Sequence, residues 1–138
     1  MTMIKQDDLI ESIAGALQFI SYYHPADFIQ AMDQAYQREQ NPAARDAIAQ
    51  ILINSRMCAE GQRPICQDTG IVTVFLKVGM NVQWQADMSV TDMCNEGIRQ
   101  AYMNPDNVLR ASILEDPDGQ RKNTGDNTPG VIHYEIVP

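Results

Sequence analysis

Polar and reactive side chains crowd one short segment, from Arg63 to Gly70, which reads Arg-Pro-Ile-Cys-Gln-Asp-Thr-Gly. Cys66 can serve as a thiolate metal ligand or as a nucleophile, because a cysteine in a loop is accessible to both metal and substrate. Gln67 can donate and accept hydrogen bonds, and Asp68 can be an acid, a base or a metal ligand. A glycine at the end of the segment lets the backbone approach a bound group closely. A capped turn with a half-buried cysteine would have the same composition, so the residues alone leave both interpretations open.

The chain has two further cysteines, Cys58 and Cys94. Both fall in segments of helical periodicity with apolar neighbours, so we expect them to pack in the core. Their spacing from Cys66 matches none of the compact patterns of ferredoxin clusters or zinc sites. An odd number of cysteines also fits a reducing compartment better than a disulfide framework.

Other patterns in the sequence exclude familiar sites. Segment 119–126 has two glycines but no Lys-Ser or Lys-Thr after the second, so it is not a phosphate-binding loop. Segment 116–119 lacks the ligand spacing of a calcium-binding loop. His24 and His133 are isolated in the sequence and are not predicted to pair as metal ligands. Arg110 stands in an apolar run, where a lone guanidinium usually pairs with a carboxylate, and a substrate could supply that carboxylate.

The composition of the chain limits the class of protein to which these residues can belong. The chain has 138 residues, 44% of them hydrophobic, which fits one globular domain with a core. Its net charge is −8 with only 10 scattered Lys and Arg, so neither nucleic acid nor an anionic membrane surface is an expected partner. No apolar run approaches the roughly 18 residues of a membrane span, and the N-terminus lacks the apolar core of a signal peptide. We therefore expect a cytoplasmic protein.

The first 60 residues have the pattern of three helices. Apolar side chains recur at helical spacing between residues 9 and 20, and again between residues 28 and 36. Asn41 followed by Pro42 is typical of an N-cap and first helical position, so a third helix begins there. We expect that helix to run to about residue 59, with Gly61 as its C-cap.

The rest of the chain mixes strands with one helix. Segment 71–78 is rich in β-branched residues and nearly continuous in hydrophobicity, as in a strand buried on both faces. A short strand is expected at 81–85, and a helix capped by Ser89 extends to about residue 103. A long polar loop covers 115–129, before an alternating strand at 131–137. The prediction is an α+β fold, with a helical N-terminal half, a small β-sheet built from 71–78 and 131–137, and a further helix.

Several stretches of the sequence, taken in order, resemble the class I, iron–sulfur-dependent fumarate hydratases and the related tartrate dehydratases. These stretches are 54–57, 64–70, 109–113, 121–129 and 132–138. The Cys-Gln-Asp-Thr-Gly element and the Asn-Thr-Gly-Asp-Asn-Thr-Pro loop carry most of the specificity. The resemblance implies that residues 1–138 are an N-terminal fragment of a longer fumarase catalytic domain. Its parts would be a helical segment 1–60, a cluster and substrate loop 61–70, and a mixed α/β segment 71–138.

The resemblance further implies a hydro-lyase that interconverts (S)-malate and fumarate on a [4Fe–4S] cluster held by three cysteines. The open iron of such a cluster acts as a Lewis acid. By analogy, Cys66 is a metal ligand, Gln67 and Asp68 line the substrate site with Asp68 as the catalytic acid, and Arg110 grips a carboxylate of the small dicarboxylate. The other cluster ligands would follow Pro138. The expected partners are therefore the remainder of the fumarase chain or a second subunit, and a second copy in a homodimer. This fragment alone would be inactive and without a cluster.

Two alternatives stay open at this stage. A tartrate dehydratase subunit would share the same motifs, and this region does not separate the two substrates. A non-catalytic helical binding or assembly module would keep the sequence without the chemistry. The second alternative follows from the single well-placed cysteine, which is not enough to hold a cubane cluster.

Overall fold

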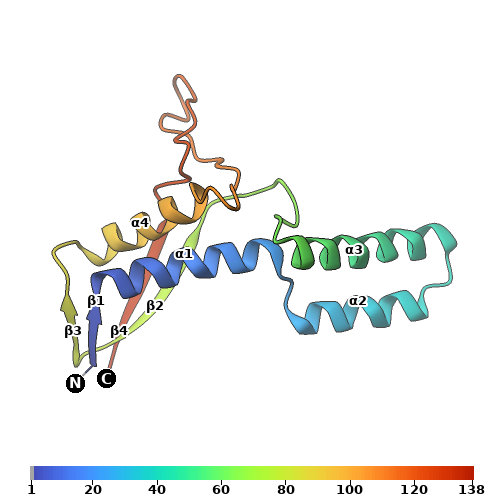
Figure 1. The fold of residues 1–138 in the computed structure, drawn as a ribbon, viewed down its shortest axis with the longest axis horizontal. Coiled ribbons are helices and arrows are strands. Elements are labelled where there is room, and N and C mark those ends of the chain that lie inside the picture. The colour runs from blue at the N-terminus through green and yellow to red at the C-terminus, as the bar shows by residue number, and fades with distance from the viewer. Residues whose placement is uncertain (1) are drawn as a thin grey trace. The chain divides into compact units, whose positions relative to one another are not determined.

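The computed structural model describes residues 2–138, which fold into four helices and four strands (Figure 1). The helices are α1 (Gln6–Tyr22), α2 (Ala26–Arg38), α3 (Pro42–Gly61) and α4 (Val90–Tyr102). The strands are β1 (Thr2–Lys5), β2 (Thr73–Gly79), β3 (Val82–Gln85) and β4 (Val131–Val137). The predicted α+β class is confirmed, with helices in the first half and strands around a further helix in the second.

Local sequence signals set the ends of α3. The Asn41 side chain accepts hydrogen bonds from the amides of Ala43 and Ala44, at 3.0 and 3.4 Å, and caps the helix as predicted. The expected C-cap at Gly61 is wrong by one residue. Helical hydrogen bonding continues through Gly61, and Gln62 takes the left-handed conformation with φ 47° while its amide bonds to the Cys58 carbonyl.

Strands β2 and β4 pair in parallel, from Thr73 opposite Val131 to Gly79 opposite Val137. This confirms the predicted sheet. A second parallel pair joins β1 to β3. The short strand near 81–85 was expected, but β1 was not, because four residues give too little pattern and its partner lies far along the chain.

Burial of β2 on both faces was expected and is wrong. Phe75 is 77% exposed and stacks on His133 across the sheet, with ring centroids 5.0 Å apart. Val74 and Leu76, on the opposite face, pack against the core cluster. Only one face of the sheet is therefore covered by the described residues, which gives the strand an alternating pattern.

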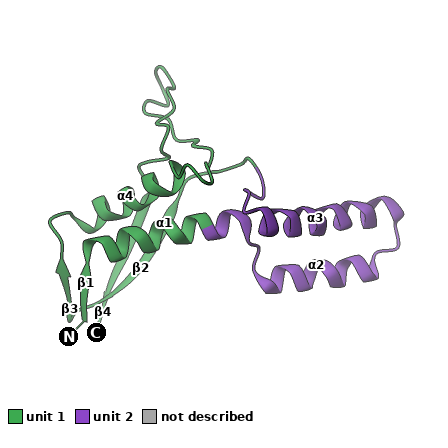
Figure 2. Ribbon diagram, in the orientation of Figure 1, with its two compact units in different colours: residues 1–18, 67–138 green, residues 19–66 purple. Residues whose placement is uncertain are grey.

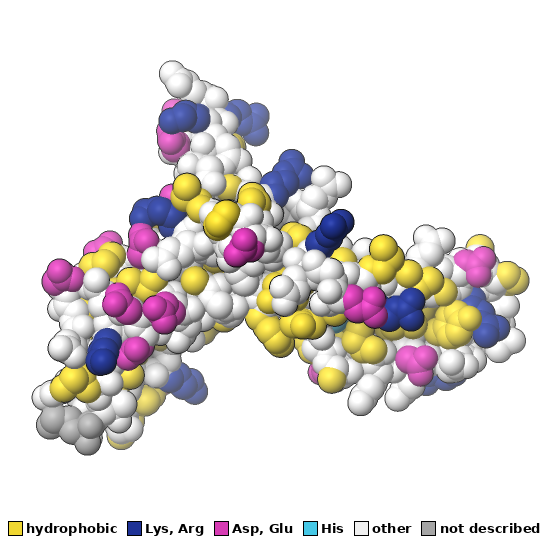
Figure 3. Space-filling view, in the orientation of Figure 1, with side chains coloured by type: hydrophobic (Ala, Val, Ile, Leu, Met, Phe, Trp, Pro, Cys, Tyr) yellow, Lys and Arg dark blue, Asp and Glu magenta, His cyan; other side chains and the backbone are white. Residues whose placement is uncertain are grey.

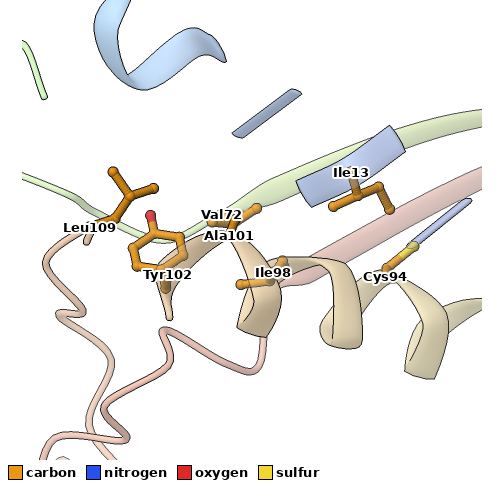
Figure 4. Close-up of a cluster of buried hydrophobic side chains, with 7 residues drawn as sticks. All are labelled: Ile13, Val72, Cys94, Ile98, Ala101, Tyr102 and Leu109. Carbon is orange, nitrogen blue, oxygen red and sulfur yellow. The ribbon is translucent and has the colours of Figure 1, made fainter. Parts of the chain in front are cut away.

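The chain divides into two compact units (Figure 2). The first contains the chain up to Gln18 together with Gln67–Pro138, and the second contains Phe19–Cys66, so one boundary falls inside α1. Figure 4 shows the core of the first unit, where side chains from α1, α4 and the flanking segments meet. Its buried members are Ile13, Val72, Cys94, Ile98, Ala101, Tyr102 and Leu109.

The second unit is a helical hairpin with few buried side chains. Helix α2 buries none of its residues, and α3 buries only Ser55 and Cys58. Ile51, Ile53 and Met57 of α3 are 43–62% exposed, and Figure 3 shows hydrophobic side chains interspersed with charged ones over this hairpin. Among residues 2–138, no helix combines the length and apolar character that crossing a membrane requires.

Candidate active site

Cys66 is the last residue of the second unit, and its thiol is exposed. The residue before it is held from both sides within that unit. The amide of Ile65 donates to the carbonyl of Ser21 at 2.8 Å, and its own carbonyl accepts from the Asn54 side chain at 3.1 Å. Hydrogen bonds to both backbone groups of Ile65 restrict its motion, so Cys66 directly follows a residue that is held within the unit.

Cys58 and Cys94 are buried, as their helical neighbours predicted. Cys58 is 6% exposed, and its thiol donates toward the carbonyl of Pro64, 3.6 Å away. Cys94 is completely buried in the core of the first unit. Burial raises the pKa of the Cys94 thiol, because a thiolate is poorly solvated in an apolar core. Both side chains therefore contribute to packing in this structure.

The first unit brings Gln67 and Arg110 together. The Nη1 atom of Arg110 donates to the backbone carbonyl and to the side-chain Oε1 of Gln67, both at 3.4 Å. The hydroxyl of Thr69 donates to the backbone carbonyl of Arg110. Asp68 lies between Gln67 and Thr69 in the chain and is exposed. Residues 43 positions apart in the sequence thus form one polar surface in the structure.

The guanidinium of Arg110 has no carboxylate within ion-pair distance in the described part of the chain. The ion pairs there join Arg56 to Glu60, Arg99 to Glu96 and Asp126, and Lys122 to Glu115. A guanidinium has five donors in a planar fork that matches a carboxylate. Arg110 therefore retains donors for an acidic ligand.

Asn127 is completely buried and bonds to both segments that form this surface. Its Oδ1 accepts from the amides of Ser112 and Ile113, at 2.7 and 3.2 Å, and its Nδ2 donates to the carbonyl of Gly70 at 3.2 Å. Ser112 adds a hydroxyl hydrogen bond of 3.0 Å to the same Gly70 carbonyl. The two segments that carry Gln67 and Arg110 are thus joined by one side chain.

The polar loop at 115–129 is ordered by its own contacts. Leu114 and Asn123 form an isolated antiparallel bridge, and Lys122 pairs with Glu115 at 3.0 Å. Burial by itself would raise the pKa of Asp126, but hydrogen bonds from Thr128 and Arg99 outweigh it and hold that pKa below its usual value. Arg99 belongs to α4, so its 3.1 Å contact ties this loop to a helix of the same unit.

Metal-ligand types are dispersed in this chain. Among residues 2–138, no three His, Cys, Asp or Glu side chains form a group that could hold a metal ion. His24 shares a 3.0 Å hydrogen bond with Ser55, and His133 stacks on Phe75. A [4Fe–4S] cluster needs several thiolates, whereas only Cys66 is an exposed cysteine here. The residues present therefore fit one ligand position of such a cluster and not the complete set.

Sequence reasoning did not find Thr69, Ser112 or Asn127 as parts of this surface. A partial signal existed, because asparagine is favoured where φ is positive, and Asn127 has φ 60°. Nothing local indicated that its side chain would be buried or which amides it would meet. That information depends on the tertiary packing of three separate segments.

Comparisons with known proteins bear on the family of the chain. The sequence model of a family described as "Fumarate hydratase (Fumerase)" matches residues 10–138. A provisionally assigned L(+)-tartrate dehydratase alpha subunit of Methanocaldococcus jannaschii is 30% identical over 78% of this chain. A provisionally assigned class I fumarate hydratase of Geobacillus stearothermophilus is 32% identical over 88%, and the L(+)-tartrate dehydratase alpha subunit of Escherichia coli K12 is 25% identical over 94%. The chain spans 38%, 22% and 42% of the lengths of these three relatives.

Proposed function

The chain belongs to the fumarate hydratase (Fumerase) family, and from this premise we propose that it forms part of a hydro-lyase that interconverts (S)-malate and fumarate. One observation carries the proposal. The exposed guanidinium of Arg110 lies against Gln67 and has no carboxylate partner in the described part of the chain. A small dicarboxylate would supply that partner, and both malate and fumarate are dicarboxylates.

Each polar residue of the surface has a separate role in this proposal. Arg110 binds one substrate carboxylate through its planar fork of donors. Gln67 holds the guanidinium and offers its remaining amide donors to the substrate. Asp68 is the proposed acid that gives a proton to the departing hydroxyl, which leaves as water. The base that removes the carbon-bound proton lies outside the residues assigned here.

Cys66 is proposed as one thiolate ligand of a [4Fe–4S] cluster. Its exposure and its fixed neighbour Ile65 suit a ligand at the edge of a loop. When bound, the cluster would supply Lewis-acid chemistry to substrate oxygens. Cys58 and Cys94 are buried, so the proposal takes the remaining ligands from outside this chain. In this proposal the isolated chain holds no stable cluster and is inactive.

The proposed assembly follows from length. Because the chain spans less than half of each relative, we propose that it is part of a larger catalytic domain. From the family resemblance we propose that it is the N-terminal part, with 61–70 as its cluster and substrate loop. The remainder is supplied by more of the same polypeptide or by a partner subunit. A homodimer of the complete enzyme is part of the same proposal.

A tartrate dehydratase subunit is the second candidate. Two of the three relatives described above carry that name, as alpha subunits. Tartrate is also a small hydroxylated dicarboxylate, so the same contacts with Arg110 and Gln67 would serve it. The residues described here offer no contact that would select between the two substrates.

The test uses the complete protein in which this chain occurs, produced with its natural continuation or partner and reconstituted with iron and sulfide without oxygen. Iron content and the dehydration of (S)-malate and L(+)-tartrate are measured side by side. We expect bound iron and faster turnover of malate. Faster turnover of tartrate would overturn the assignment of malate as the substrate. Iron-loaded protein that turns over neither compound would overturn the proposed hydro-lyase activity.

A further inference from the structure

We propose that Asn127 is a positioning residue, which holds Gln67 and Arg110 at the separation that one dicarboxylate requires. The inference rests on the proposed function, because the substrate defines that separation. Asn127 itself is completely buried and does not reach the exposed surface. Its effect is therefore exerted through the two segments that it joins.

The Asn127 amide uses both of its ends. Its oxygen accepts from the backbone amides of Ser112 and Ile113, which lie 15 and 14 positions earlier in the chain. Its nitrogen donates to the carbonyl of Gly70, 57 positions earlier. Backbone groups buried without partners are costly, so each of these bonds constrains where its segment lies.

The bonds of Asn127 also restrict Gln67 and Arg110, because both residues lie only a few positions from the residues that Asn127 holds. Ser112 lies two residues after Arg110, and Gly70 lies three residues after Gln67. The Thr69 hydroxyl bonds to the Arg110 carbonyl, and the Ser112 hydroxyl bonds to the Gly70 carbonyl at 3.0 Å. These two bonds connect the same two segments that Asn127 joins. We call the three sets of bonds, made by Thr69, Ser112 and Asn127, the ladder; Asn127 is its buried member.

Asn127 is itself anchored to α4. Its neighbour Asp126 accepts from Arg99 at 3.1 Å, and the amide of Gly130 donates to the Asn95 side chain at 2.9 Å. Both partners lie on α4. The ladder therefore rests on a helix that carries much of the core of this unit.

Asparagine satisfies both the backbone and the side-chain requirements at this position. Its φ of 60° is left-handed, where asparagine and glycine are tolerated and most other residues are strained. Aspartate has the same shape but, when ionised, cannot donate to the Gly70 carbonyl. Glycine would keep the backbone and remove all of the side-chain hydrogen bonds. These differences allow the backbone and side-chain contributions to be separated.

The first experiment measures steady-state kinetics of the complete, iron-loaded enzyme with Asn127→Gly. We expect a raised KM for the dicarboxylate and a fall in kcat/KM on the order of 100-fold, the effect of misplacing binding groups by about 1 Å. Iron per protein should stay at the wild-type level, because the side chain of Asn127 bonds to Ser112, Ile113 and Gly70, none of which is the proposed ligand. A merely structural role would lower the active fraction and thus the apparent kcat, while leaving KM unchanged.

Two further variants control the experiment. Asn127→Asp keeps the acceptor for Ser112 and Ile113, so its KM should fall between those of the wild type and Asn127→Gly. Asn123→Ala removes an exposed asparagine of the same loop, which bonds to the Ala111 carbonyl at 2.8 Å but not to the Gly70 segment. It should keep the wild-type KM. A wild-type KM in Asn127→Gly, or an equal rise in Asn123→Ala, overturns the proposal.

Amide hydrogen exchange tests the connection that Asn127 makes between the two segments, and it needs no measurement of activity. In Asn127→Gly, the amides of Ser112 and Ile113 should lose protection, while that of Gly130, which bonds to Asn95, keeps it. Unchanged protection at Ser112 and Ile113 overturns the proposal. If the wild-type enzyme turns over neither malate nor tartrate, the proposed function fails. Selective loss of protection at the amides of Ser112 and Ile113 in Asn127→Gly then still supports the connection between the two segments.

Discussion

Gly97 of α4 lies so close to Ile10 of α1 that a β-carbon at Gly97 would stand 2.8 Å from the Ile10 carbonyl oxygen. The same β-carbon would lie 2.9 Å from the β-carbon of Ile13. Both distances are shorter than ordinary contacts, and one of them involves backbone that cannot rotate away. The packing of α1 on α4, and with it the core of the first unit, therefore requires glycine at position 97.

Gly97→Ala should therefore destabilise the chain, even though alanine favours a helix more than glycine does. Overpacking costs about 1–3 kcal/mol, which exceeds the gain of up to ~1 kcal/mol in helix propensity. Gly15→Ala is the matched control, because Gly15 is also within a helix but a β-carbon there meets nothing within 4 Å. Urea unfolding should show opposite signs for the two variants, and stabilisation by both would contradict the packing argument.

Much of the fold was predictable because its signals are local. Asn41 with Pro42 marks the start of α3 through a cap that needs only neighbouring residues. The alternating run at 131–137 and the apolar run at 71–78 predicted a sheet, although they did not show which residues pack on its faces. Strand β1 and the division of the chain inside α1 escaped prediction, because both depend on contacts between distant segments.

The three cysteines should react with iodoacetamide in a defined order. Cys66 is exposed, whereas Cys58 is 6% exposed and Cys94 is completely buried. Alkylation of a buried thiol requires local opening, so Cys66 should be modified first and the other two only as denaturant is added. Mass spectrometry of peptides from partly alkylated chain gives the order. Modification of Cys94 before Cys66 would show that the core of the first unit opens more easily than its packing implies.

Replacement of the same cysteines separates packing from ligation. Cys94→Ala should lower the free energy of unfolding by about 1 kcal/mol through lost core contacts, with little change in iron content of the complete enzyme. Cys66→Ala should leave the stability of the isolated chain within about 0.5 kcal/mol and remove or loosen the iron. Thermal unfolding and iron assays on both variants are the measurements. Full iron in Cys66→Ala would refute its assignment as a ligand.

Asp126 should make stability depend on pH in the acid range. Burial alone would raise its pKa, but Thr128 and Arg99 reverse the shift, so the folded pKa lies below the ordinary value of 3.8. A lowered carboxyl pKa gives stability that is present above pH 3.8 and is lost as pH falls through the folded pKa. Asp126→Asn should therefore cost about 1 kcal/mol at pH 7, and progressively less below pH 4.

The measurement for Asp126 is urea unfolding of wild type and variant between pH 7 and pH 3. Asp118→Asn removes the same charge from an exposed position of the same loop and is the matched control. A difference between wild type and Asp126→Asn that grows as pH falls would have the wrong sign for this carboxylate.

The candidate site was only partly predictable from the residues. Their chemistry marked 63–70 as a loop of interest, but Arg110 joined that loop only through the family resemblance. The contact between Arg110 and Gln67 spans 43 positions, and no periodic pattern encodes such a contact. Asn127 is the extreme case, since its role depends on amides from another loop and a carbonyl at the end of a third segment.

Arg110→Lys tests whether the guanidinium fork, and not merely its charge, binds the substrate. Lysine keeps the charge but cannot make two parallel hydrogen bonds to a carboxylate. Loss of one charge-assisted hydrogen bond, worth about 1.5–3 kcal/mol, should raise the KM for malate roughly tenfold or more in the complete enzyme. Iron content should not change. Arg121→Lys makes the same exchange at an exposed arginine of the 115–129 loop, outside the Gln67 contact, and should keep the wild-type KM. If Arg110→Lys bound malate as well as wild type did, or if both variants weakened binding equally, Arg110 would not be the carboxylate-binding residue.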